Sequence, residues 1–278
     1  MDYDNGLQSP ELEAEYLVAH TIAKSLDEIE KYADFPLSDE LQCQLSAMVE
    51  RRINQRTPVL YLTQEAYFAG FKFYVDERVL IPRSRIENIL DDPDGLHGLM
   101  EGHRPLRRAL DLCTGSGCLA ISMALLYPGL KVDAADLSKD ALAVAKKNCK
   151  IHKTGHRVRL VESDLFQNLK GSCYDLIVTN PPYVPTQIYD DLKEEYMQEP
   201  KMALEAGGDG LDLVLPILQQ AADFLEPGGV LLCEVGDDTE EIMQKRWPNL
   251  PIEWLMFHFG GSGVFATTRE QLLEWDGS

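Results

Sequence analysis

The chain has 278 residues, of which 45% are hydrophobic, and a formal net charge of −20. It contains no apolar run of the roughly 18 residues that a membrane helix needs, and its acidic start lacks the apolar core of a secretion signal. We therefore expect cytoplasmic localisation without a membrane partner. The net charge disfavours direct binding to nucleic acid, and it fits either a basic protein partner or solubility alone.

The cysteines and histidines show no pattern that indicates a metal site. The six cysteines lack C-x-x-C spacing, and the six histidines lack H-E-x-x-H or other ligand spacing. We therefore expect reduced thiols and no bound metal.

Residues 1–66 are predicted to form an N-terminal helical domain that recognises the substrate. The first helix begins near Pro10 with acidic residues in its first turn, which favours the helix dipole. Its apolar residues recur at helical spacing: Leu12, Tyr16, Ala19 and Ala23. A second helix begins after Ser38, a plausible N-cap, and ends near Gln55.

Residues 67–105 are predicted to form a hairpin and a linker. Aromatic and β-branched residues alternate around Gly70, and the pattern favours two strands with a turn near residues 76–78. A helix is expected from about Arg85, and a polar, turn-rich loop is expected over residues 91–105.

Strands and helices alternate over residues 106–278, which we assign to a catalytic domain. We predict strands at 107–113, 131–136, 158–163, 174–180 and 230–235, and helices at 117–127, 138–152, 211–225 and 238–246. Such alternation predicts a parallel sheet covered by helices on both faces. The last two strands, 252–257 and 263–267, have no helix between them and should form an antiparallel hairpin linked by residues 260–263.

Polar groups follow the first three strands of this sheet. The first strand runs into the glycine-rich turn Asp111-Leu-Cys-Thr-Gly115-Ser-Gly117. Asp136 ends the next strand 19 residues after Gly117, near the spacing at which an acidic residue reaches ribose hydroxyls in dinucleotide folds. Asp164 and Leu165 follow the third strand. Because open α/β sheets bind ligands at the carboxyl ends of their strands, we expect a binding cleft there.

The fourth strand ends abruptly at Asn180-Pro181-Pro182-Tyr183. Two prolines cannot extend a sheet, because each lacks a donor and fixes φ near −65°. The stop leaves Asn180 and a backbone carbonyl facing the cleft. Both are acceptors suited to a planar –NH2 group.

The D-x-x-T-G-S-G turn, the acidic strand ends and N-P-P-Y together resemble the class I S-adenosylmethionine-dependent methyltransferases. N-P-P-Y in this position is similar to the HemK group, which methylates a glutamine side-chain amide. Residues 57–62, 73–84 and 260–265 resemble the PrmB branch, which acts on the third protein of the large ribosomal subunit. The release-factor branch usually has Pro-Asp-Thr-Glu where this chain has Ser84-Arg-Ile-Glu87.

The resemblance covers about residues 50–272 and implies a fold, a cofactor and a reaction. The fold would be α/β and Rossmann-like, with a mainly parallel seven-stranded sheet, an antiparallel closing hairpin and a small N-terminal helical domain. The cofactor would be S-adenosylmethionine. The enzyme would be a protein-glutamine N-methyltransferase.

The resemblance also implies a cofactor set. Thr114, Gly115 and Gly117 would cradle the methionine part, and Asp136 would accept from the ribose hydroxyls. Asp164 would accept from the adenine amino group, with Leu165 against the ring. Asp111 is either an anchor of the turn or a contact to the cofactor amine. The set is completed by Cys113, Ser116 and Asn180.

Asn180, Pro181 and Tyr183 are the predicted catalytic residues. An amide nitrogen is a poor nucleophile because its lone pair is delocalised, so the reaction needs positioning and electrostatics more than a general base. Asn180 Oδ1 and the Pro181 carbonyl would hold the substrate –NH2, and Tyr183 would lie against the amide plane. Pro182 completes the substrate set together with Arg83, which contacts either the substrate backbone or an acidic group of the enzyme.

A loop after the motif, with Glu205, Gly207 and Gly208, is expected to form one wall of the cleft. Four alternatives remain open. They are the same chemistry on peptide chain release factor, methylation of a nucleic-acid base amine, a catalytically silent module that docks on ribosomal proteins, and an NAD dehydrogenase. Base methylation is disfavoured by the net charge, and the dehydrogenase by the incomplete G-x-G-x-x-G.

Overall fold

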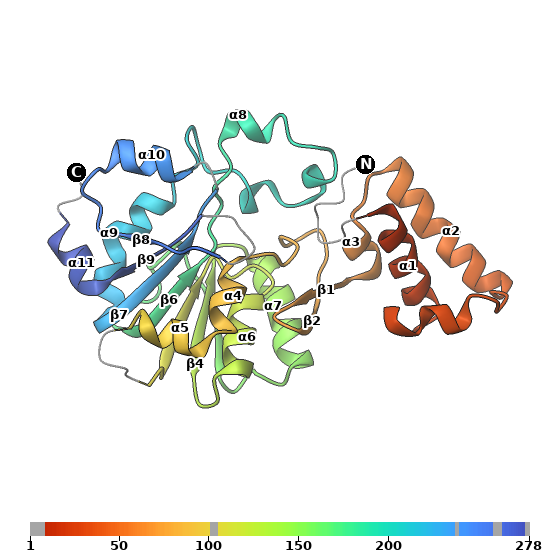
Figure 1. Cartoon of the computed structure of the whole chain (residues 1–278), viewed down its shortest axis with the longest axis horizontal. Helices are drawn as coiled ribbons and strands as arrows, with labels where there is room; N and C mark the ends of the chain where they lie inside the picture. Colours follow the sequence, from red (N-terminus) through yellow and green to blue (C-terminus); the bar gives the residue numbers. More distant parts are fainter. Residues whose placement is uncertain (1–8, 101–104, 237–238, 258–262, 276–278) are drawn as a thin grey trace.

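The computed structural model describes residues 9–100, 105–236, 239–257 and 263–275, and its centre is a seven-stranded sheet in the order β5-β4-β3-β6-β7-β9-β8 (Figure 1). Five strands pair in parallel: β3 (Arg108–Leu112), β4 (Lys131–Asp136), β5 (Val158–Glu162), β6 (Tyr174–Thr179) and β7 (Leu225–Glu234). The antiparallel strands are β9 (Val264–Thr268), which pairs with β7, and β8 (Glu253–Trp254), which pairs with β9. The predicted fold, mainly parallel with an antiparallel closing hairpin, is confirmed.

Helices cover both faces of this sheet because side chains alternate between faces along each strand. Ala109 and Val132 face a core formed with α4 (Ile86–Leu90), α5 (Pro93–Gly98), α6 (Cys118–Leu126) and α7 (Lys139–Ile151). Leu110 and Ile177 face the opposite core, formed with α9 (Val214–Phe224), α10 (Thr239–Arg246) and α11 (Arg269–Glu274). The second core ends in an aromatic cluster in which Trp247 and Trp275 lie with ring centroids 6.2 Å apart and Trp254 lies 5.5 Å from Phe265.

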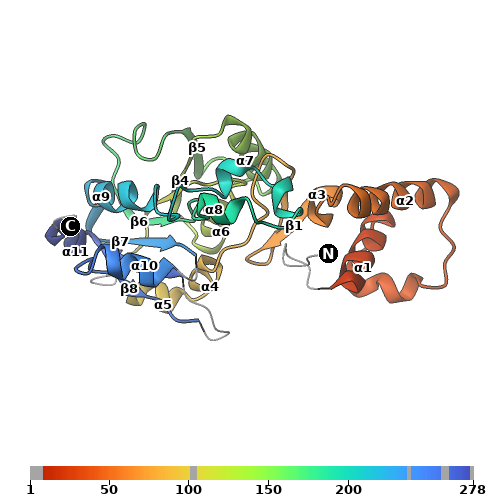
Figure 2. The ribbon, with the colours of Figure 1, turned by 90° about the horizontal axis from the view of Figure 1, so that it is seen from above.

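An N-terminal helical lobe lies to one side of the sheet in both views, with a small hairpin between them (Figures 1 and 2). The lobe consists of α1 (Pro10–Thr21), η1 (Leu26–Tyr32), α2 (Asp39–Asn54) and α3 (Val59–Thr63). Ser9 and Ser38 cap α1 and α2 by accepting from the backbone N–H groups of Leu12 and Leu41. Both predicted helices are therefore confirmed. No helix of the described residues combines the length and apolar character that a membrane crossing requires.

The hairpin differs from its prediction. It consists of β1 (Glu65–Phe68) and β2 (Phe71–Tyr74), joined at Ala69 and Gly70, which have φ of +49° and +73°. The turn predicted at residues 76–78 is wrong, because Gly70 adopts the left-handed region at no steric cost and turns the chain early. Asp76 instead organises a local loop, where its Oδ1 accepts from the Arg78 backbone N–H at 3.1 Å.

Other elements also depart from the predicted pattern. Helix α5 lies where a loop was predicted. Pro93 is its first residue, a position at which the backbone N–H has no partner within the helix, so proline does not disrupt it. Strand β7 begins at Leu225, ahead of Gly228-Gly229, and the register with β6 shifts between Tyr174 and Leu176. The chain after the Asn-Pro-Pro-Tyr motif contains three short helices that the sequence analysis does not predict: α8 (Thr186–Tyr189), η2 (Tyr196–Gln198) and η3 (Lys201–Ala203). The C-terminal helix α11 is also not predicted. The link predicted at 260–263 lies mostly outside the described residues.

A buried amide joins the hairpin to the sheet core. Asn148 of α7 accepts from the Tyr74 backbone N–H at 2.8 Å through Oδ1. Its Nδ2 donates to the Tyr74 carbonyl at 3.0 Å and to the Ser116 carbonyl at 2.9 Å. One side chain therefore satisfies three backbone groups, from the end of β2 and from the glycine-rich turn.

Replacing Asn148 with Leu should leave these three groups unpaired. We expect the free energy of unfolding to fall by about 3 kcal/mol or more, since each of the three polar groups left without a partner costs about 1–3 kcal/mol. Urea denaturation of this variant and of the exposed control Asn54→Leu would measure it. Equal midpoints for the two variants would contradict the role of Asn148.

Candidate active site

A cleft opens at the carboxyl ends of the parallel strands, where the sequence predicts it. It holds about 780 Å³ of empty space when its open mouth is included. Of the predicted site residues, seven line this cleft: Cys113, Gly115, Asp136, Asp164, Leu165, Asn180 and Pro182.

Asp111 and Thr114 lie behind the glycine-rich turn rather than along the cleft. Asp111 is fully buried, and its Oδ2 accepts from the Thr114 hydroxyl and, at 3.0 Å, from the Ala120 backbone N–H. Its Oδ1 has no hydrogen-bond partner among the described residues. Burial raises the pKa of Asp111 to about 7, although both hydrogen bonds act to lower it. Asp111 thus anchors the turn and keeps one carboxylate oxygen unused.

The two glycines of the turn have different surroundings. Both adopt positive φ, +55° at Gly115 and +81° at Gly117. A Cβ at Gly115 would meet no atom within 4 Å, so this position faces open space in the cleft. A Cβ at Gly117 would lie 3.1 Å from Ala145 Cβ, so this glycine lets α6 and α7 approach each other. Gly115 borders the ligand space, whereas Gly117 and the buried Ser116 belong to the packing behind it.

Asp136 presents its carboxylate to the cleft from the end of β4. Oδ2 accepts from the Gly115 N–H and Oδ1 from the Ser138 N–H, each at 2.8 Å. Burial raises its pKa, and these backbone hydrogen bonds act in the opposite direction. The carboxylate is fixed in orientation while each oxygen keeps a further lone pair for a ligand.

Asp164 and Leu165 form the far side of the cleft. The exposed Asp164 accepts from Gln167 Nε2 at 2.8 Å, and Leu165 has φ of +45°. The Ser163 hydroxyl holds this turn by donating to the Leu165 carbonyl at 2.6 Å. Cys113 also lines the cleft. Burial raises the pKa of its thiol and raises the pKa of the Cys118 thiol to about 12, so both thiols stay protonated.

Asn180 lies where the cleft meets a second, smaller pocket. That pocket is lined by Pro181 and Tyr183 and shares Asn180, Leu80 and Ala203 with the cleft. The Asn180 Nδ2 donates to the Arg83 carbonyl at 3.2 Å, which directs Oδ1 away from that carbonyl. The motif therefore separates two adjoining spaces and keeps an amide oxygen available between them.

Arg83 binds an acidic group of the protein, which is one of the two roles considered for it. Its Nη1 donates to both oxygens of the buried Glu199, at 2.8 and 3.0 Å. Glu199 also accepts from the Ile81 backbone N–H at 3.0 Å. The segment that carries Arg83 is thereby fixed next to Asn180.

The loop after the motif forms a wall of the cleft as predicted, but not through Glu205, Gly207 and Gly208. Glu205 accepts from the Thr186 hydroxyl at 2.5 Å, and the Gly207 carbonyl accepts from the Thr186 backbone N–H at 2.7 Å, so both lie against the chain after the motif. The same loop contributes a wall through other residues: Pro200, Met202 and Ala203. Gly210 allows this close approach, since a Cβ there would come 2.2 Å from the Tyr183 carbonyl oxygen.

Glu234, at the end of β7, is a residue that the sequence reasoning missed. Its Oε2 accepts from the Ser84 hydroxyl at 2.5 Å and from the Arg85 backbone N–H at 3.0 Å. Burial raises its pKa to about 7. The signal was present, because Glu234 ends the fifth parallel strand as Asp136 ends the second. This carboxylate holds the segment whose Arg83 carbonyl orients Asn180.

Two family models match the chain. The methyltransferase small domain matches residues 97–216, and the PrmC N-terminal domain matches residues 4–63. The ribosomal protein uL3 glutamine methyltransferase of Neisseria meningitidis serogroup B is 46% identical over 271 residues, covering 98% of this chain and 88% of that protein. The protein of the same description from Neisseria gonorrhoeae is 45% identical and covers 98% and 89%.

Solved structures with low sequence identity share the fold. The hMettl16 catalytic domain in complex with MAT2A 3′UTR hairpin 6 aligns with a TM-score of 0.53 at 16% identity, over 84% of this chain and 82% of that one. A methyltransferase from Pyrococcus furiosus aligns with a TM-score of 0.50 at 16% identity, over 84% of this chain and 99% of that one. At such identities the likeness concerns the fold alone.

The raised pKa of Glu234 predicts a dependence of stability on pH. Its folded-state pKa of about 7 exceeds its ordinary value of 4.5, so the native state holds a proton that the unfolded state releases. The stabilisation is complete below about pH 4.5 and is lost as the pH rises to about 7. Relative to Glu234→Gln, the free energy of unfolding of the parent should fall by roughly 3 kcal/mol across this window.

Thermal and urea unfolding at pH 4.5, 5.5, 6.5 and 7.5 would measure this difference. The exposed Glu241→Gln variant is the matched control. A difference between the parent and Glu234→Gln that stays constant with pH would contradict the prediction.

Proposed function

The chain belongs to the family of ribosomal protein uL3 glutamine methyltransferases, and from this premise we propose that it transfers a methyl group from S-adenosylmethionine to the side-chain amide nitrogen of a glutamine in ribosomal protein uL3. The observation that carries this proposal within the molecule is the meeting of two pockets at Asn180. The cleft provides space for a cofactor, and Asn180 and Pro181 at its border carry the oxygens that can accept from an amide –NH2.

The residues around the glycine-rich turn fit S-adenosylmethionine. Asp111 keeps Oδ1 without a partner among the described residues, and Gly115 leaves open space where a Cβ would stand. In this proposal Asp136 accepts from the ribose hydroxyls, while Asp164 and Leu165 hold the adenine. When bound, S-adenosylmethionine supplies an electrophilic methyl group. The roles of Thr114, Ser116 and Gly117 are to shape the turn that receives it.

The acceptor amide is held by groups of the Asn-Pro-Pro-Tyr segment. Asn180 Oδ1 and the Pro181 carbonyl accept hydrogen bonds from the acceptor –NH2, and Tyr183 lies against the amide plane and excludes water. The two oxygens stabilise positive charge as it develops on the acceptor nitrogen, which is the step that a delocalised amide makes difficult. The Arg83 carbonyl fixes Asn180 in this orientation through the bond at 3.2 Å.

The protein acceptor is proposed to contact more than the cleft. The formal charge of −20 attracts a partner rich in Lys and Arg, as expected of a protein that binds ribosomal RNA, and such attraction speeds encounter. We assign recognition of the acceptor to residues 1–66, a hairpin and linker to residues 67–105, and the chemistry to residues 106–278.

Methyl transfer from labelled S-adenosylmethionine to separate acceptors tests this function. The acceptors would be purified uL3, peptide chain release factor and unmethylated DNA. We expect label in uL3, mapped by mass spectrometry to one glutamine. Label in release factor alone would keep the chemistry and change the partner, and label only in DNA would refute the proposal.

Asn180→Ala should remove transfer without removing cofactor binding. The variant lacks the oxygen that holds the acceptor amide, so kcat should fall about a hundredfold or more. The affinity for S-adenosylmethionine, measured by calorimetry, should stay within about threefold of the parent, since most of the cleft is unchanged. Turnover at the parental rate would show that Asn180 does not hold the acceptor.

A further inference from the structure

Besides a buried hydrogen bond from the Tyr61 hydroxyl to the Val79 carbonyl at 2.5 Å, two larger contacts join the helical lobe to the rest of the protein. The first is apolar: Leu17, Met48 and Leu60 share a buried cluster with Ala141 and Val144 of α7. Burial of apolar surface is not directional, so this contact holds the lobe in place without fixing its angle.

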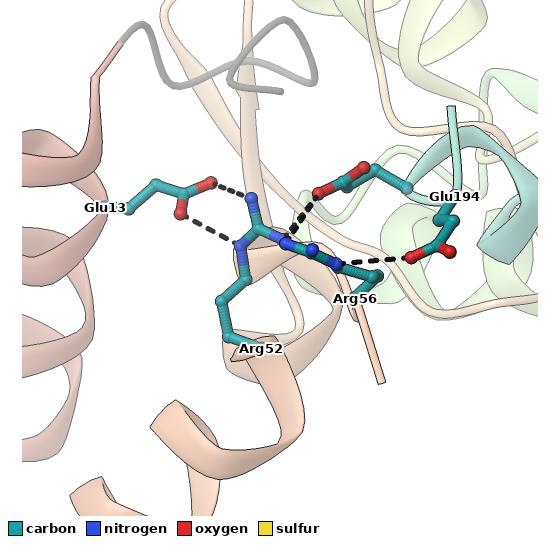
Figure 3. A network of polar contacts seen from close by, with 5 residues as sticks. Glu13, Arg52, Arg56 and Glu194 are labelled. Atoms are coloured by element: carbon teal, nitrogen blue, oxygen red, sulfur yellow. Dashed lines mark hydrogen bonds and ion pairs between the residues drawn. The ribbon is translucent and has the colours of Figure 1, made fainter. Parts of the chain in front are cut away.

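The second contact is an ionic cluster, which we call the Arg52 cluster: Glu13, Arg52, Arg56, Glu194 and Glu195. Figure 3 shows Arg52 facing Glu13, and Arg56 facing Glu194. Arg52 of α2 donates through Nε and Nη2 to the two oxygens of Glu13 of α1, at 2.9 and 3.1 Å. Its Nη1 donates to Glu195 at 3.1 Å, outside the lobe. Arg52 thus joins both helices of the lobe to the segment that follows the Asn-Pro-Pro-Tyr motif.

Burial makes Arg52 the dominant member of this cluster. The side chains of Arg52, Glu13 and Glu195 are only 5%, 12% and 6% exposed. Burial acts to lower the pKa of Arg52, but the hydrogen bonds to Glu13 and Glu195 outweigh it, and the pKa lies above its ordinary value. Removing one partner would leave a buried charge uncompensated, which is strongly unfavourable.

The geometry of the guanidinium adds direction to this attraction. The planar fork of an arginine matches a carboxylate through two parallel hydrogen bonds and so restricts their relative orientation. The Arg56–Glu194 pair, at 3.2 Å, has side chains 34% and 77% exposed, and exposed pairs contribute little. Of the ion pairs in the Arg52 cluster, those of Arg52 therefore restrict the angle between the lobe and the catalytic region most.

The partner segment reaches the active site within a few residues. Glu199, four positions after Glu195, holds Arg83 and the Ile81 backbone. Pro200, Met202 and Ala203 then line the cofactor cleft. In Figure 1 this stretch extends from α8 towards the N-terminal lobe. The same ten residues, 194–203, therefore contact the lobe at one end and the cleft at the other.

We propose that Arg52 is a positioning residue. It holds the lobe at an angle at which the lobe and the cleft form one continuous surface for a folded protein acceptor. This inference rests on the proposed function, and it assigns to Arg52 the recognition of the acceptor rather than the chemistry. A short peptide acceptor reaches only the Asn180 pocket and does not use the lobe. Loss of Arg52 therefore affects the two kinds of acceptor differently.

The test compares five variants of the full chain, one of them the double variant Arg52→Met/Glu195→Gln. Arg52→Met removes the charge, and Arg52→Lys keeps the charge without the fork. Glu195→Gln keeps the Arg52–Glu13 pair and weakens the contacts of Arg52 and Arg56 with Glu195. Arg51→Met is the matched control, since Arg51 is the exposed neighbour on the same helix. For each variant, kcat and KM are measured with folded uL3 and with a short peptide that contains its target glutamine. Cofactor affinity, thermal unfolding and small-angle scattering accompany the kinetics.

Arg52→Met and Glu195→Gln should raise KM for the folded acceptor by about tenfold while kcat changes less than about twofold. The KM of Arg52→Lys for the folded acceptor should lie between the values of the parent and of Arg52→Met. The double variant Arg52→Met/Glu195→Gln should be no worse than Arg52→Met, because both changes remove one shared interaction. The peptide kinetics and the cofactor affinity should stay at the parental values, and scattering should show a broader range of lobe positions.

An unchanged KM for the folded acceptor in both Arg52→Met and Glu195→Gln would overturn the inference. A parallel loss with peptide, folded acceptor and cofactor would also overturn it, since that pattern indicates general destabilisation. Absence of label on uL3 with the parent would instead refute the proposed function. In that case the scattering comparison of Arg52→Met with Arg51→Met would still decide whether Arg52 sets the position of the lobe.

Discussion

The parallel pairing of β3, β4, β5, β6 and β7 is the constraint from which the site follows. Parallel strands direct all their carboxyl ends to one edge of the sheet, so the groups that end them must meet. The glycine-rich turn, Asp136 and Asn180 come from distant parts of the chain and border one cleft for this reason. Two prolines then keep the fourth strand from continuing into the space that the ligand needs.

Buried carboxylates fix the segments that surround this edge of the sheet. Glu234 holds Ser84 and Arg85, Glu199 holds Arg83, and the Arg83 carbonyl receives the Asn180 amide. None of these acids faces the cleft as a lining residue, yet together they determine where an amide oxygen points. The site therefore depends on a hydrogen-bonded support drawn from β7, from the loop after the motif and from the segment before α4.

Much of this was predictable from the sequence, and the failures have a common physical origin. The family resemblance is confirmed by relatives that match nearly the whole chain, and the strands were found because buried parallel strands read as continuous apolar runs. The predicted hairpin turn is misplaced because aromatic and β-branched residues alternate on both sides of Gly70. Glu234, Glu199 and Arg52 act through partners far along the chain, which local periodicity does not encode.

The aromatic cluster at the far edge of the sheet has an optical consequence. The chain has three tryptophans, and Trp247, Trp254 and Trp275 all pack around β8, β9 and α11. Intrinsic tryptophan emission therefore reports on that edge alone. The helical lobe carries tyrosine but no tryptophan, so partial melting of the lobe would leave the emission spectrum unchanged while circular dichroism loses helical signal. The two spectroscopies would separate the lobe from the sheet without any label.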